Sequence, residues 1–506
     1  NARRVPRAMG GASELPRCVA RDGLVLEGLS SGSILRVEPC EILSDQSSAP
    51  SSPAPLEGEL RLSSWPRTAM VVMGQVMGTG VLALPHACAQ LGWVVGLGAI
   101  ALFAAAGTYA GILLARSRAL HPEEPESYAE LARLTGGRSF GAFTRVAILG
   151  SWTLILPYYL LTCAQAAELA FAAVDANGQV SFCQWHWTAA VAIALLPPLQ
   201  LRTLHQISLL ALVSTIAVSI AIVVALASLL WEAPDAHGAS ATRSSATTSL
   251  WPPSLESPMR LYAYTGEIIY AFQGHSIFLE LVREMKIPKH FSRALYVSNA
   301  IMAFVYVVTS MVGYMARGND VAGFLPESMS VGLPRAIVGG LLAFHTAVGY
   351  LITALPLQRE MLLLISPCQP MMTASCASST DKQTLIADAS LQSAYFPDTL
   401  RWLLISLFQL AFSFLVANGI PFFALFQSLL GSLTGAPILF GWPAFFFLSS
   451  CHLRGRSITL GDFLGCGIFL FVCTPLLTGL GTINAIVDIQ RAWVDSAMSS
   501  PFMCTR

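Results

Sequence analysis

The chain has 506 residues, of which 54% are hydrophobic and only 11% charged, and its formal net charge is zero. Soluble domains carry about 25% charged residues, so this composition excludes an ordinary soluble domain and indicates an integral membrane protein. Lys and Arg form no basic stripe apart from the loops between apolar runs, which argues against nucleic-acid binding.

Residues 1–63 are rich in Arg, Ser, Pro and Gly and hold no apolar run of helix length, so we expect a disordered cytosolic tail. Residues 64–490 form the apolar domain, and 491–506 a short C-terminal tail. Eleven apolar runs in this domain are long enough to cross about 30 Å of hydrocarbon. They are 66–90, 92–115, 146–174, 187–203, 206–231, 260–284, 292–316, 332–357, 399–419, 421–450 and 460–488. The sequence therefore predicts an all-α membrane protein with eleven transmembrane helices.

The distribution of basic residues predicts the orientation in the membrane. If the N-terminus is cytosolic, the cytosolic segments hold 23 of the 29 Lys and Arg residues and the outer segments hold six. Cytosolic loops are enriched in Lys and Arg, so we expect the N-terminus inside and the C-terminus outside. We expect the loop 366–397 to be flexible and cytosolic. The membrane itself, plasma or vacuolar and endomembrane, stays open, as does the oligomeric state.

The first apolar run contains the stretch GQVMGTGVLALP, from Gly74 to Pro85, which is poorly suited to an unbroken helix. Each interior Gly costs about 1 kcal/mol relative to Ala, and Pro about 3 kcal/mol. Five spans later, YTGEIIYAFQGHSIFLELVREM carries the helix-weakening residues Gln273, Gly274 and His275. Interrupted segments at corresponding positions of two halves are typical of an inverted-repeat transporter whose site lies near the membrane midplane. Five plus five spans and one extra helix agree with the eleven counted.

Such an interruption would create a binding site. If the first span unwinds between Met77 and Leu82, its second half begins a new helix whose free N–H groups and positive dipole end suit a carboxylate. Carbonyls freed from the first half would suit a cation or an ammonium group. The alternative is that Gly74, Gly78 and Gly80 only permit close helix packing, as small residues often do in membranes.

Glu267 is the strongest candidate for a functional ionisable residue because it lies in the middle of an apolar span. A carboxylate there costs about 2.5–3.5 kcal/mol, so it faces a wet cavity or is protonated, which suits a coupling proton. Its helical neighbours include Tyr270 and Gly274, which would place an acid, a phenol and the break on one face. A purely structural acid paired with a donor on another helix is the alternative.

Other polar residues in the spans are weaker candidates. His275 lies just past the second break and His345 inside the eighth span, and either is a packing residue or a relay. Tyr158 and Tyr159 follow Pro157 in the third span, where a tyrosine either contacts substrate or packs. The chain carries no hydrolase or nucleotide-binding motif and no metal-ligand spacing, so we expect no enzyme activity, no metal and no cofactor.

Four stretches in order along 64–490 resemble the amino acid/auxin permease family. GTGVLALPHACAQLGW (78–93) resembles its first-span signature, and GEIIYAFQGHSIFLEL (266–281) is similar to its sixth-span motif. HTAVGYLITALPLQREM (345–361) and NGIPFFALFQSLLGSLTGAPILFGWPAFFFL (418–448) look like its eighth-span and tenth-span regions. The resemblance implies a LeuT-type five-plus-five fold with broken helices 1 and 6, and a secondary carrier of amino acids.

Carried onto this sequence, the resemblance implies that the substrate carboxylate binds at Gly78, Thr79, Gly80 and Val81. It implies a coupling or gating acid at Glu267. Pocket contacts would come from the stretch Phe272, Gln273, Gly274 and His275. With Met77 at the break, and Tyr158 and Tyr270 from the residues themselves, these form the predicted substrate site.

The chain departs from the family pattern at three positions: Glu267 stands where Asp is common, Gln273 where a small residue is common, and His86 where an aromatic is common. We expect a proton-coupled amino acid symporter in the lipid bilayer. Sodium coupling, an organellar carrier and a substrate-sensing receptor are the alternatives.

Overall fold

The computed structural model describes residues 63–172, 182–201, 205–232, 247–253, 261–365 and 384–495. The tail predicted at 1–63 therefore lies outside the described residues except for Ser63. The described residues contain helices and one isolated β-bridge, between Ser63 and Met285, and no strand. The expectation of an all-α chain is confirmed for this part of the protein.

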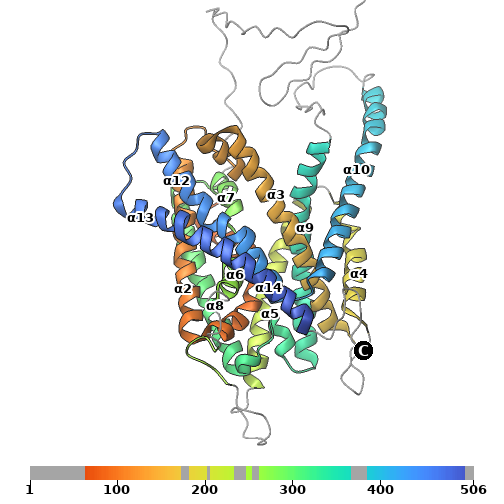
Figure 1. The fold of residues 1–506 in the computed structure, drawn as a ribbon. Helices are drawn as coiled ribbons and strands as arrows, with labels where there is room; N and C mark the ends of the chain where they lie inside the picture. The colour runs from red at the N-terminus through yellow and green to blue at the C-terminus, as the bar shows by residue number, and fades with distance from the viewer. Residues whose placement is uncertain are drawn as a thin grey trace, which may run out of the picture.

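The helices follow one another in the order of the apolar runs (Figure 1). Their bounds are α1 (Trp65–Val76), α2 (Leu84–Ala119), α3 (Tyr128–Phe171), α4 (Gln184–Leu195), α5 (His205–Trp231), α6 (Leu261–Ala271), α7 (Phe278–Glu284), α8 (Phe291–Arg317), α9 (Leu333–Ile365), α10 (Thr384–Gly419), α11 (Phe423–Leu430), α12 (Trp442–Leu453), α13 (Leu460–Ile468) and α14 (Gly481–Asp495).

Eight helical segments in the described residues are long and apolar enough to cross a membrane. The other three predicted spans coincide with shorter helices, since α1 and α4 have 12 residues each and α6 has 11. Two of these three, α1 and α6, are the spans in which the sequence predicted an interruption. Their shortness follows from the breaks, because each is only the first half of a longer apolar run.

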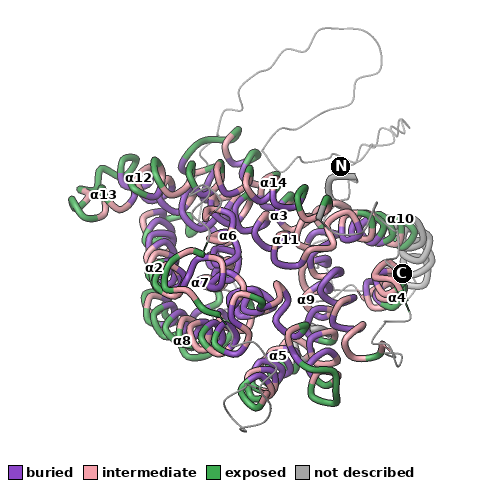
Figure 2. Tube along the Cα trace, turned by 60° about the horizontal axis from the view of Figure 1, so that its bottom comes forward, coloured by how far each residue is buried: buried purple, intermediate pink, exposed green. Residues whose placement is uncertain are grey.

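The helices form a bundle in which segments far apart in sequence pack together. Helix α2 packs on α8, α3 packs on α9, and α6 lies against α2, α11 and α14. Figure 2 shows buried residues concentrated around α6, α7 and α11, and exposed residues on the outward faces of α5, α8 and α13. The exposed side chains of these outer faces include Leu212, Phe304 and Phe463, which are apolar as a lipid-facing surface requires.

The first helix is interrupted at the predicted stretch. Helix α1 ends at Val76, Met77 and Gly78 leave helical geometry, and the 3-10 helix η2 (Thr79–Ala83) leads into α2. Pro85 lies in the first turn of α2, where a missing N–H costs no helical bond. Further along, Gly92 has φ +73° and turns the chain back, which separates the first predicted span from the second.

The second interruption lies at Phe272 to Gly274. Helix α6 ends at Ala271, and the chain resumes with η6 (His275–Ile277) and α7. The hydroxyl of Tyr306 on α8 donates to the carbonyl of Ala271 at 2.7 Å and so satisfies one of the acceptors left at the helix end.

Two segment ends differ from the sequence expectation. Helix α10 begins at Thr384, so part of the loop expected at 366–397 is helical, while 366–383 lie outside the described residues. Helix α14 continues to Asp495 and includes Arg491, so the boundary expected at 490 falls inside a helix.

The tenth span is locally widened by π-helical turns. Two π-helical turns, η10 (Gly431–Gly435) and η11 (Pro437–Gly441), separate α11 from α12. At η10 the backbones of two segments nearly touch, because a Cβ placed on Gly431 would lie 1.9 Å from the carbonyl oxygen of Gly266. A side chain at position 431 would therefore push α6 away from the tenth span.

We expect Gly431→Ala to lower the stability of the purified protein by about 1–3 kcal/mol, the usual cost of overpacking a close contact. Thermal unfolding in detergent measures it. Gly467→Ala is the matched control, because a Cβ there meets nothing within 4 Å and alanine favours the helix. Equal melting temperatures for both variants would contradict the close contact.

Candidate functional site

The two interrupted helices meet each other at their breaks. A Cβ placed on Gly274 would lie 2.3 Å from Val76 Cγ2, and one placed on Gly80 would lie 2.9 Å from Ala271 Cα. Neither position has room for a side chain. At Gly80, and at Gly74 against Thr215 of α5 (2.9 Å), close packing accounts for the glycine directly. Gly78 has more room, since its nearest neighbour would be His345 Nε2 at 3.4 Å.

A small cavity of about 70 Å³ lies at this junction, which we call the central pocket. Its lining comes from both breaks and from one face of α3. The lining residues are Gln75, Val76, Gly78, Thr79, Gly80, Ser151, Trp152, Ile155, Tyr159, Tyr270, Gln273 and Ser276.

Five of the residues predicted for the substrate site line the central pocket. They are Gly78, Thr79, Gly80, Tyr270 and Gln273. Met77, Val81, Tyr158, Phe272, Gly274 and His275 lie nearby but outside its lining. Phe272 packs edge-on against Tyr306, and His275 Nε2 donates to the carbonyl of Gly107 at 2.8 Å.

His345, the weaker histidine candidate, is buried beside the first break. Its Nδ1 lies 2.8 Å from Ser214 Oγ on α5, so it joins α9 to α5 next to Gly78.

One face of α3 contributes lining residues that sequence reasoning missed. Ser151, Trp152 and Ile155 lie four to eight residues before Tyr159, a spacing that puts all four on one side of a helix. Tyr159 was a candidate on its own, so helical periodicity applied to it would have found the others.

Gln427 on α11 connects both breaks. Its Nε2 donates to the carbonyl of Gly80 at 3.0 Å and to the carbonyl of Glu267 at 2.9 Å. Its Oε1 accepts from the hydroxyl of Tyr158 on α3 at 2.8 Å. The side chain is fully buried, and these three bonds use both N–H donors of the amide and one of the two acceptor sites of its oxygen. A single amide thus joins four segments of the bundle.

An aromatic layer lies next to the central pocket. The ring of Tyr158 is 5.0 Å from that of Tyr270, which lines the pocket, and 5.3 Å from that of Phe423 on α11. Tyr158 therefore acts in the structure as a packed member of this layer.

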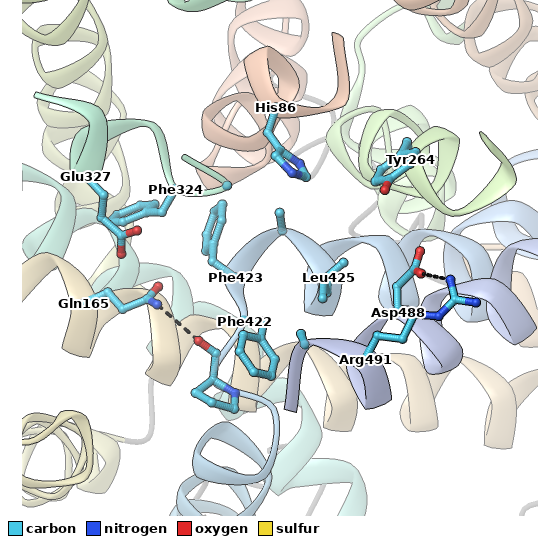
Figure 3. Close-up of a pocket in the computed structure, with 14 residues that line it drawn as sticks. His86, Gln165, Tyr264, Phe324, Glu327, Phe422, Phe423, Leu425, Asp488 and Arg491 are labelled. Carbon is cyan, nitrogen blue, oxygen red and sulfur yellow. Dashed lines mark hydrogen bonds and ion pairs between the residues drawn. The ribbon is translucent and has the colours of Figure 1, made fainter. Parts of the chain in front are cut away.

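On the other side of the aromatic layer lies a larger pocket of about 730 Å³, which we call the vestibule (Figure 3). Its aromatic lining residues are Tyr264, Phe324, Phe422 and Phe423, and its polar ones are His86, Gln165, Glu327, Asp488 and Arg491. Asp488 and Arg491 form an ion pair at 3.3 Å on α14. Figure 3 shows His86 pointing into this pocket from α2.

The carboxylate of Glu267 is fully buried and pairs with His86. The Nδ1 atom of His86 lies 3.3 Å from both carboxylate oxygens, Oε1 and Oε2. The histidine side chain is 18% exposed and the glutamate side chain 0%. From the sequence, His86 stood out only as a departure from the family pattern. Because an acid in the middle of a membrane needs a partner, the histidine that follows Pro85 is the feature of the sequence that could have identified the partner of Glu267.

Comparison with known proteins supports a transport function. Residues 61–487 match the family model described as transmembrane amino acid transporter protein. The chain belongs to this family. It is 23% identical over 433 residues to amino acid transporter AVT1C of Arabidopsis thaliana, an alignment that covers 85% of this chain and 70% of the relative.

Two further relatives extend the comparison beyond one sequence. Amino acid transporter AVT3A of Arabidopsis thaliana is 24% identical over 87% of this chain and 93% of its own length. The vesicular GABA transporter of Caenorhabditis elegans is 27% identical over 42% of this chain and 41% of its own length. Family membership and the membrane-spanning helices identify an integral membrane protein of the amino acid transporter class, with no enzymatic function.

We expect Gln427→Leu to lower the stability of the purified protein by about 1–3 kcal/mol, because it leaves two buried carbonyls and a tyrosine hydroxyl without this partner. Thermal unfolding in detergent is the measurement. Gln409→Leu is the control, since the hydrogen bond of that buried amide to Met361 Sδ is a weak one of 3.7 Å. A loss no larger than that of the control would show that Gln427 does not hold the breaks together.

Proposed function

We propose that the protein is a secondary active carrier that moves amino acids across a membrane by alternating access, with proton symport as its coupling mode. The observation that carries this proposal is the junction of two interrupted helices beside a fully buried carboxylate, Glu267. Helix interruptions at membrane depth are tolerated where they line a cavity or are buried in protein, and here they do both.

We further propose eleven membrane spans in a LeuT-type arrangement of two inverted five-span repeats plus one helix. The packing supports this arrangement, because partners five spans apart lie against each other. Helix α2, the second span, packs on α8, the seventh, and α3, the third span, packs on α9, the eighth. The two broken spans, first and sixth, likewise meet.

Alternating access is supported by the two pockets and the layer between them. The vestibule and the central pocket lie on either side of Tyr158, Tyr270 and Phe423. A substrate passing from one to the other must displace these rings, which is the behaviour of a gate. With the N-terminus in the cytosol, as the basic residues favour, the vestibule faces the outer or luminal side of the plasma membrane or an endomembrane.

For the ligand, we propose that an amino acid carboxylate binds at the start of η2, where Gly78, Thr79 and Gly80 line the central pocket. The family and the names of the relatives support an amino acid as the class of substrate. The affinity for the carboxylate would come from N–H groups that begin a helix and have no intrahelical partner.

The hydrogen bonds of Gln427 favour a proton over sodium at this junction. Sodium would need backbone carbonyls, and those of Gly80 in η2 and of Glu267 in α6 already accept from the Gln427 amide. Glu267 beside His86 offers a titratable pair instead. A sodium-coupled carrier and a substrate sensor stay as outcomes of the test.

We expect radiolabelled amino acids to accumulate in proteoliposomes when a proton gradient is imposed, and Glu267→Gln to abolish this accumulation while sparing exchange of substrate. An uncharged amide keeps the size of the side chain but carries no transferable proton. Glu284→Gln, an exposed acid at the end of α7, is the matched control and should accumulate substrate as the natural protein does.

Three other results would overturn parts of this proposal. Accumulation driven by a sodium gradient alone would exclude proton coupling. Saturable binding without accumulation would favour a sensor. Undiminished concentration of substrate by Glu267→Gln would remove Glu267 from the coupling mechanism.

We expect Gln273→Ala to shift the substrate preference toward larger amino acids by about tenfold, the lower end of what a methylene-sized change in a pocket is worth. Gln273 lines the central pocket, whose 70 Å³ is tight for a large side chain. Competition of unlabelled amino acids against labelled uptake measures the preference. Gln200→Ala, outside both pockets, serves as the control, and an unchanged ranking in Gln273→Ala would place the substrate side chain elsewhere.

A further inference from the structure

His86 is the residue that connects the buried acid to the vestibule. The carboxylate of Glu267 has no exposed surface and does not line the vestibule, whereas His86 lines it and is partly exposed. Among the described residues, His86 provides the hydrogen-bonding contact of that carboxylate, through Nδ1 at 3.3 Å from each oxygen. A proton moving between vestibule water and Glu267 therefore meets the imidazole first.

We propose that His86 is the proton relay through which Glu267 exchanges its coupling proton with the vestibule. This inference rests on the proposed proton-coupled transport. It assigns to His86 the entry step on the vestibule side, in addition to the neutralisation of a buried charge.

The chemistry of the imidazole ring suits this step. Vestibule water gives a proton to Nε2, and the resulting imidazolium gives the proton on Nδ1 to a Glu267 oxygen. One N–H bond forms at Nε2 and one breaks at Nδ1, so the ring is neutral again and the carboxylate has become a carboxylic acid. The starting tautomer is restored when vestibule water takes the proton on Nε2 and a proton returns to Nδ1. Histidine is the side chain whose ordinary titration lies closest to neutral pH.

The surroundings of the pair leave this route open. The segments packed against α6 are α2, α11, α14, η2, η10 and η13 (Leu476–Leu480). Among the described side chains, the ionisable groups that these segments bring near the pair are Cys88, a buried free thiol on α2, and the ion pair Asp488 and Arg491 on α14.

Three tyrosines and one glutamate are the further ionisable residues near the pair. The tyrosines around it are Tyr158, Tyr264 and Tyr270, and Tyr264 meets the His86 ring edge-on at 6.0 Å. Glu327 lines the same pocket across from His86 (Figure 3). None of these residues lies between Nδ1 and the Glu267 oxygens, which are in direct contact.

The alternative is that His86 only neutralises Glu267 as a fixed ion pair. The two roles differ when the hydrogen bond is kept and the relay is removed. His86→Asn does this, because its Nδ2 amide occupies the place of Nδ1 and donates a hydrogen bond but transfers no proton. His86→Gln is the second variant, whose amide reaches toward the vestibule instead.

The experiment measures two quantities in proteoliposomes for the natural protein, both His86 variants, Glu267→Gln and the control His290→Gln at the opposite end of the bundle. The first is the initial rate of amino acid uptake as a function of the external pH. The second is exchange of labelled for unlabelled substrate at equal pH on both sides.

We expect His86→Asn to exchange substrate within about twofold of the natural protein, while its proton-driven uptake falls about tenfold or more and loses its dependence on external pH. His290→Gln should match the natural protein in both measurements. An unchanged pH profile in both His86 variants would overturn the relay, and so would equal loss of exchange and driven uptake in both, which indicates a structural role.

The two proposals fail in distinguishable ways. If the natural protein shows no accumulation under a proton gradient, the proposed function fails. If the natural protein accumulates substrate and Glu267→Gln does not, but the His86 variants do, the proposed function stands and the relay alone is wrong.

Discussion

The amide of Gln427 is the interaction on which the rest of the site depends. An interrupted helix leaves backbone carbonyls without partners, and in hydrocarbon no water is present to donate hydrogen bonds to them. Gln427 donates to the carbonyl of Gly80 at one break and to that of Glu267 in the helix before the other, while its own oxygen accepts from Tyr158. One side chain from the tenth span thus joins the first interruption to the helix that precedes the second, and both to the third span.

Close contacts at three glycines hold these segments together in addition to the Gln427 amide. Gly80 lies against Ala271, Gly274 against Val76, and Gly431 against Gly266, each at a distance that leaves no room for a Cβ. The glycines therefore have two effects, which are alternatives when the sequence is read alone. They end the helices, and they let the broken ends approach each other closely enough to enclose a pocket.

The positions of Glu267 and of the two pockets make the two sides of this junction different. Glu267 reaches the vestibule through His86, whereas the central pocket lies on the other side of the aromatic layer that contains Tyr158. In the proposed proton symport, a proton and an amino acid are released on the same side of a closed gate. Under that proposal, the placement of the His86–Glu267 pair on the vestibule side of the gate would link the movement of the proton to that of the amino acid.

The sequence by itself determined the membrane class, the order of the helices and the points at which α1 and α6 end, because composition and the positions of Gly and Pro act locally along the chain. It also identified Glu267, Tyr270 and Gln273 as polar residues beside a break. Only the tertiary structure decided that His86 pairs with Glu267 and that Gln427 spans both breaks. These contacts join residues 181 and 160 positions apart, and no local pattern specifies which distant polar groups meet when the helices pack.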